Sequence, residues 1–130
     1  LPHWMMALTA TGRTEAAQRM IEAMRSFGRG NGPTERLVGR VALPVCEALV
    51  AHRAGRPADA LALLRPVVGD MYLLGGSHAQ QDVLEQLYLD AAMKADSADD
   101  VRLILERVAG RHPVPPARRI GWAAAAHCLH

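Results

Sequence analysis

One stretch of the chain, LLGGSHAQQDVLEQL at residues 73–87, carries residue types that could do chemistry. A nucleophilic serine needs a histidine and an acid within reach, and Ser77, His78 and Asp82 supply these three types. Asp82 lies one helical turn beyond His78, so these two side chains could touch. The stretch is nevertheless not the G-x-S-x-G elbow of serine hydrolases, and we expect no strand before it.

The same stretch has a structural explanation as the corner between two helices. Gly75 or Gly76 can adopt the left-handed conformation that ends a helix. Ser77 can cap the next helix, and Gln80, three residues later, can complete a capping box. A capping serine directs its hydroxyl at its own backbone. We therefore predict a corner at this point and assign no catalytic residue.

Histidine and cysteine gather at the end of the sequence, in HCLH at residues 127–130. His127 and His130 would share one helix face beside Cys128. Two or three ligands do not close a zinc site without a fourth, so we predict no metal and no other cofactor. The other histidines are expected to be scattered surface or helix-end residues: His3, His52 and His112.

Composition favours helices. About half of the 130 residues are apolar, mostly Ala, Leu, Val and Met, and only 4% are aromatic, which predicts an all-α chain. The length fits a single domain, residues 1–130. Cys46 and Cys128 are too few for a disulfide framework, which favours a reducing compartment and a cytoplasmic location. No apolar run is long enough to span a membrane, so no membrane contact is predicted.

Basic residues invite a nucleic-acid hypothesis, because all but one of the 15 Lys and Arg residues are arginine. RNA binding needs a basic face with interleaved aromatic side chains. The arginines are instead spread over most of the chain and many lie near Glu. We therefore predict no nucleic-acid partner.

Clusters of Gly, Pro, Asp and Ser divide the chain into helical lengths. The short connections between these lengths are typical of helical hairpins. The predicted helices span residues 1–10, 14–27, 34–54, 57–74, 78–95, 98–110 and 116–128.

Three segments repeat one pattern without gaps: GRTEAAQRMIEAM at 12–24, GRPADALALLRPV at 55–67 and DSADDVRLILERV at 96–108. Each begins at a turn position, has Ala or Val five residues later and a large aliphatic residue four residues after that. The second helix of a tetratricopeptide repeat has this pattern. The periods of 43 and 41 residues exceed the usual value of about 34, so a HEAT-like pair, with a period of about 40–47, is the alternative.

Two prolines interrupt the predicted hairpin at 34–74. Pro44 and Pro66 each lie eleven residues from Gly55, so they would stand at one height in an antiparallel pair. Each removes a backbone hydrogen bond and kinks its helix. We expect a static bend shared by both helices, and a hinge is the alternative.

The predicted helix at 78–95 has a polar side opposite its apolar face. A solvated face with an Asp90–Lys94 pair is one interpretation. The other is a concave binding surface, because first helices of such repeats line the inner wall of the superhelix. An acidic wall would select basic peptides. The candidate partner-binding residues are His78, Asp82, Glu85, Gln86 and Asp90.

Two segments resemble the C-terminal part of the tetratricopeptide repeat protein 38 family: YLLGGSHAQQDVLEQLYLDAA at 72–92 and ALPVCEALVAHRAGRPADALALLRP at 42–66. The family stretch Gly-Gly-Ser-His-Ala-Gln followed by Arg-Asp-Val-Phe is matched by residues 75–80, Asp82 and Val83. Gln81 stands where Arg is usual and Leu84 where Phe is. The resemblance covers roughly residues 42–95 and implies the C-terminal portion of a longer helical-repeat protein, without an established reaction or ligand.

These patterns predict a right-handed α-α superhelix, tetratricopeptide-like, of about three long hairpins with a closing helix at PARRIGWAAAAHCLH. The predicted function is a protein-interaction scaffold that binds a protein or peptide segment on its concave face. The alternative is a small-ligand or enzymatic pocket around His78, Asp82 and Tyr72. Trp4, Met5 and Leu8 are expected to be exposed at the first helix and to promote self-association.

Overall fold

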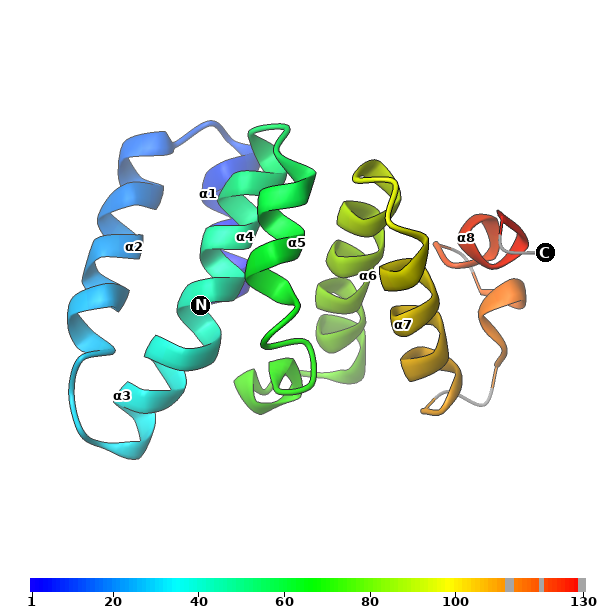
Figure 1. Cartoon of the computed structure of the whole chain (residues 1–130). Coiled ribbons are helices and arrows are strands. Elements are labelled where there is room, and N and C mark those ends of the chain that lie inside the picture. Colours follow the sequence, from blue (N-terminus) through cyan, green and yellow to red (C-terminus); the bar gives the residue numbers. More distant parts are fainter. Residues whose placement is uncertain (112–113, 120, 129–130) are drawn as a thin grey trace.

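The computed structural model describes residues 1–111, 114–119 and 121–128. Within these ranges regular structure is helical throughout, which confirms the predicted all-α class. Figure 1 shows the helices side by side, with α2 at one end, then α1, α4 and α5, then α6 and α7, and α8 at the other end. No helix among these residues is long and apolar enough to cross a membrane. In chain order the elements are α1 (Pro2–Ala10), α2 (Thr14–Phe27), α3 (Pro33–Leu37), the π-helix η1 (Val38–Ala42), α4 (Leu43–Arg53), α5 (Pro57–Leu64), the 3-10 helix η2 (Met71–Leu74), α6 (His78–Lys94), α7 (Ala98–Ala109), the 3-10 helix η3 (Pro116–Arg118) and α8 (Ala123–Cys128).

Three helix pairs share one turn structure. Gly12, Gly55 and Asp96 stand between α1 and α2, α4 and α5, and α6 and α7, and all three have positive φ, at 71°, 77° and 56°. In each turn the amide of the next residue donates a hydrogen bond of 2.9 Å to the carbonyl five residues earlier in the chain. This is the 6→1 hydrogen bond of a Schellman motif. These bonds run from Arg13 to Leu8, from Arg56 to Ala51 and from Ser97 to Ala92. The three sequence repeats therefore correspond to three equivalent hairpin turns.

The remaining positions of the repeat point into the core. The position five residues after each turn is held by Ala or Val, and the position four residues later by a large aliphatic side chain. All six are buried: Ala17, Ala60, Val101, Ile21, Leu64 and Leu105. A small residue lets two helices approach, and the larger one fills the space beside it. The pattern seen in sequence thus marks the core-facing side of α2, α5 and α7.

The predicted helix at 34–54 is helical throughout but changes its winding. α3 passes into the π-helix η1, which in turn passes into α4 just before Pro44. A proline has no amide proton, and its ring clashes with the carbonyl four residues earlier, so a wider turn before it relieves that contact. The backbone at Gly28, just after α2, also comes very close to η1. A Cβ on Gly28 would lie 2.7 Å from Gly39 Cα.

The prediction of one helix over 57–74 with a bend shared by Pro44 and Pro66 is wrong. α5 ends at Leu64, turns follow, and η2 occupies residues 71–74. Pro66 lies just beyond the end of the helix, where it cannot donate the next backbone bond. The predicted helix at 116–128 is likewise not continuous, because η3 and α8 are separate elements.

Candidate functional site

Ser77 begins α6 as the sequence predicts. Its hydroxyl accepts a hydrogen bond from the Gln80 amide over 3.2 Å, and Gln80 Oε1 accepts one from the Ser77 amide over 2.9 Å. Gly75 and Gly76 have φ of 78° and 93°, a region open to glycine. The capping box is confirmed, and the Ser77 hydroxyl is engaged with its own backbone.

His78 and Asp82 point to different surroundings. His78 is exposed to solvent. Asp82 accepts a hydrogen bond from Gln86 Nε2 over 2.6 Å and pairs with Arg119 Nη2 over 2.8 Å. The side chains of Asp82 and Arg119 are each only 17% exposed. Asp82 therefore fastens the C-terminal segment to α6.

Asp90 joins two hairpins. Its Oδ2 lies 2.5 Å from His52 Nε2 of α4 and 2.8 Å from Lys94 Nζ of α6. The Asp90–Lys94 pair is confirmed. His52 is in the last turn of α4, which agrees with the prediction of a helix-end residue, but its side chain is 24% exposed and contacts α6. Burial raises the pKa of Asp90, but the hydrogen bonds with Lys94 and His52 outweigh it and lower that pKa below its ordinary value. This carboxylate is therefore ionised and held between two helices.

Glu85 is buried, contrary to the predicted polar side of α6. Its side chain is 5% exposed, and Arg111, from the turn after α7, pairs with it. A cavity beside it, lined also by Tyr72 and Gln81, has about 10 Å³ of free volume. That volume holds roughly one water molecule.

The predicted acidic wall is therefore not a row of free carboxylates. Each of its three acids meets a cationic or imidazole side chain that lies far away in sequence: Arg119 for Asp82, Arg111 for Glu85 and His52 for Asp90. Of the five candidates, His78 stays exposed and Asp90 stays 46% exposed. The others are half-buried or buried.

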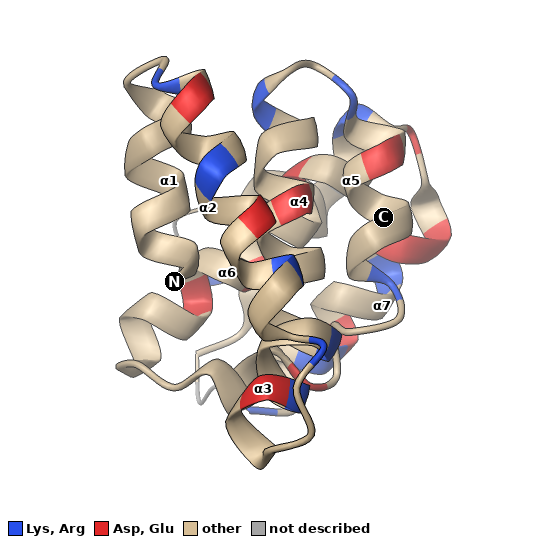
Figure 2. Cartoon of the chain, turned by 90° about the vertical axis from the view of Figure 1, so that its left-hand side faces the viewer, with Lys and Arg blue, Asp and Glu red and all other residues tan. Residues whose placement is uncertain are grey.

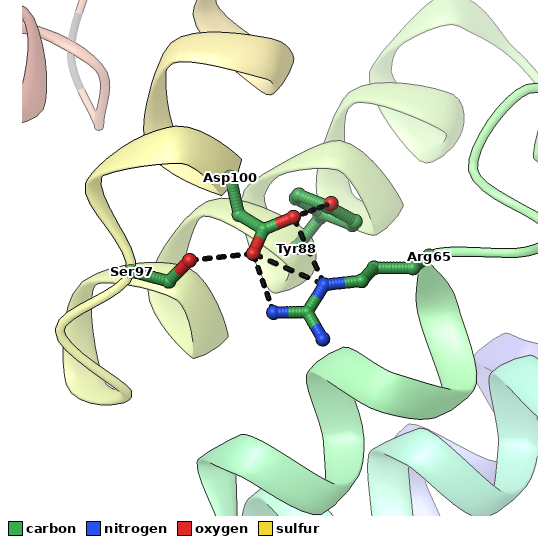
Figure 3. Close-up of polar contacts among 4 residues, drawn as sticks. All are labelled: Arg65, Tyr88, Ser97 and Asp100. Atoms are coloured by element: carbon green, nitrogen blue, oxygen red, sulfur yellow. Dashed lines mark hydrogen bonds and ion pairs between the residues drawn. The ribbon is translucent and has the colours of Figure 1, made fainter.

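A second polar cluster joins α5, α6 and α7 and was not predicted (Figure 3). Asp100 accepts hydrogen bonds from Arg65 Nη2 over 2.6 Å and from Tyr88 Oη and Ser97 Oγ over 2.5 Å each. Its side chain is 10% exposed. The only sequence signal was the helix-start spacing of Ser97 and Asp100.

Charge is strongly stabilised on Asp100. The hydrogen bonds from Arg65 hold the pKa of Asp100 well below its usual range, and those from Ser97 and Tyr88 act in the same direction against the effect of burial. Burial, followed by the hydrogen bond to Asp100, raises the pKa of Tyr88 above its usual range. The cluster thus combines a neutral phenol, an ionised carboxylate and the Arg65 guanidinium, an arrangement that holds three helices together.

Open grooves lie between helices among the described residues. One, of about 180 Å³, is formed by α2, α4 and α5, with Ile21, Val50 and Leu63 among its lining residues. Another, of about 380 Å³, lies between α7 and the C-terminal segment and is lined mainly by apolar residues such as Leu105 and Pro116. A further groove, of about 220 Å³, lies between α6, α7 and α8. Each is of the size of one or a few side chains.

Metal and thiol chemistry find no support in the part of the chain that the structure describes. No group of three or more His, Cys, Asp and Glu residues is placed there to hold a metal ion. His112 and His130 lie outside the described residues. Cys46 is fully buried, and burial raises the pKa of its thiol to about 12, so it stays protonated and unreactive.

No protein-family model and no solved structure matches this chain.

Proposed function

We propose that this chain is a tetratricopeptide-like interaction domain that binds a segment of another protein, and that it forms the C-terminal part of a member of the tetratricopeptide repeat protein 38 family. The observation that carries the binding proposal is the presence of open, side-chain-sized grooves, one between the first two hairpins and one between α7 and the C-terminal segment. Grooves of this kind accept the anchoring side chains of a peptide or helix. The three equivalent hairpin turns support the repeat assignment, and from that assignment we infer the right-handed superhelix.

The paired charges of α6 change what a partner could recognise there. Asp82 and Glu85 hold Arg119 and Arg111 within the protein, so their amide variants would loosen the fold as well as remove charge. A preference for basic peptides on this face therefore loses its support. His78 and Asp90 remain the two predicted residues that a partner could reach.

The alternative of a small-ligand or enzymatic pocket around His78, Asp82 and Tyr72 has no geometric support. Tyr72 is 53% exposed and lines the small cavity beside Glu85. Neither His78 nor Asp82 lines that cavity. We therefore propose no reaction.

A peptide-display selection on the whole chain tests the proposed function. Enriched peptides should bind reversibly, and amide NMR shifts should place them in a groove between helices. A helical domain of unrelated sequence, selected in parallel, is the control for peptides that bind any helical surface. Failure to enrich peptides beyond that control would contradict the proposed function.

A further inference from the structure

The groove between α2, α4 and α5 combines an apolar floor with a charged rim. Ile21 and Ala51 are buried at its base, and Val50 and Leu63 are half-buried beside them. A cavity of about 150 Å³ accepts a benzene molecule, so this groove of about 180 Å³ has room for one leucine or phenyl side chain. Val50 and Leu63 thus offer apolar contacts to one such side chain, between polar side chains that make up most of the exposed lining.

The rim carries two guanidinium groups that are only loosely held. Arg25 Nη2 lies 3.9 Å from Glu47 Oε2, beyond hydrogen-bond distance, and its side chain is 48% exposed. Arg56 Nη1 lies 3.3 Å from Asp59 Oδ2, and both side chains are more than half exposed. Exposed pairs of this type contribute little, so both guanidinium groups can turn to other carboxylates.

The charges of this groove differ from those of α6. Its rim carries two arginines, the lining carboxylate of Glu47 and the Asp59 carboxylate beside Arg56, and the three helices bring charged residues together on the side of the molecule shown in Figure 2. On α6, by contrast, Asp82 and Glu85 are shielded and closely paired. Arginine binds carboxylates well because its planar fork offers two parallel donors.

We propose that this groove binds a peptide segment in which a leucine or phenylalanine is flanked by acidic residues, with Arg25 and Arg56 contacting the acids and the apolar floor holding the anchor. This inference rests on the proposed function and names the partner class. The groove spans two hairpins, so the segment would lie across α4 between α2 and α5.

Four short peptides with blocked ends test the assignment by NMR titration of the isotope-labelled chain. The central sequences are Glu-Glu-Leu-Glu-Glu, Glu-Glu-Phe-Glu-Glu, Glu-Glu-Ala-Glu-Glu and Lys-Lys-Leu-Lys-Lys. We expect saturable shifts from at least one of the first two, concentrated at amides of α2, α4 and α5. The alanine peptide should bind more weakly because it lacks the anchor, and the lysine peptide should not bind this groove.

Arginine variants identify the contacts. Arg25→Gln and Arg56→Gln should each weaken binding of the acidic peptide by about fivefold, as loss of one exposed charge contact predicts. Arg102→Gln is the matched control, because Arg102 is similarly exposed and pairs with Asp99 over 3.4 Å at the same spacing. All three side chains are exposed, so the variants should fold.

The assignment is overturned if neither acidic peptide gives saturable shifts, if the lysine peptide binds this groove equally well, or if the first two arginine variants bind like the control. Each of these results can occur while the display selection still yields ligands for another groove. The proposed function fails separately, when that selection yields none.

Discussion

Replacing Asp100 by Asn should lower the free energy of unfolding by about 2 kcal/mol, because it weakens charge-assisted hydrogen bonds in a nearly buried site. The neighbouring Asp99→Asn is the control. The Asp99 side chain is fully exposed and pairs only with Arg102 at the surface, so its loss should leave stability nearly unchanged. Urea unfolding followed by circular dichroism measures both, and equal effects would contradict a structural role for Asp100.

Asp100 should also make the stability of the folded protein sensitive to acid. The pKa of Asp100 is depressed in the folded protein, whereas an unfolded aspartate has a pKa of about 3.9. The stabilisation is therefore complete above about pH 4 and is lost as the pH falls toward the lower folded value. Unfolding free energies at about pH 5 and about pH 3 should differ more in the natural protein than in Asp100→Asn. An identical loss in both would exclude this contribution.

The role of a residue was predictable from sequence where its contact partner lies within one helical turn. The capping box of Ser77 and Gln80 and the Asp90–Lys94 pair involve spacings of three and four residues, and both are confirmed. The contact between His52 and Asp90 joins positions 38 residues apart. Helical periodicity places a side chain on one side of its own helix, but it does not tell which other helix covers that side.

At the scale of elements, the hairpin turns differ in one residue type. Gly55 has φ of 77°, and a Cβ there would meet no atom within 4 Å, so Gly55→Ala adds backbone strain without a clash. We expect it to lower the unfolding free energy by about 1 kcal/mol. Asp96 holds the same conformation with a side chain, so Asp96→Gly should relieve strain and raise stability.

Thermal unfolding of both variants measures this pair of effects. Gly69→Ala is a control for the added methyl group, because a Cβ at Gly69 also meets no atom within 4 Å and its φ lies outside the left-handed region. If Gly55→Ala and Gly69→Ala were equally stable, backbone strain would not explain the glycine in the turn.

Element boundaries followed the sequence closely where turn residues mark them. α2 matches its predicted range, and α6 ends one residue before its predicted end. The π-helix η1 was not predicted, because its formation depends on tertiary contacts such as the close approach of Gly28 to Gly39. The prolines were visible, but sequence alone did not show that Pro66 would follow the end of α5 rather than bend it.

For the whole molecule, polar contacts help to join the third hairpin to the second. α5 packs on α6, and the side-chain bridges Arg65–Asp100 and His52–Asp90 cross the same junction. Half-exposed polar bridges of this kind contribute little net stability but require specific partners, so they favour one relative placement of neighbouring helices. Of the acids that suggested a ligand surface in the sequence, Asp90 thus helps to fix how two hairpins lie, whereas Asp82 and Glu85 hold the C-terminal segment and the turn after α7.

The exposed side of α1 bears on self-association. Met5 was expected to be exposed and is fully buried, and Leu8 is half-buried. Trp4 and Leu1, however, are 71% and 51% exposed, and α1 contains no Lys, Arg, Asp or Glu to discourage an apolar contact (Figure 2). An exposed apolar surface of this kind favours association between copies.

We therefore expect the average mass in sedimentation equilibrium to rise with protein concentration, and Trp4→Gln to shift the equilibrium toward monomer. Phe27→Gln is the control, because Phe27 is 48% exposed but lies at the far end of α2. The natural protein could instead stay monomeric at every concentration, or the two variants could associate alike. Either result would show that α1 is not the contact between copies. Burial of the Trp4 ring is the interaction that should stabilise such a contact, and Phe27 does not take part in it.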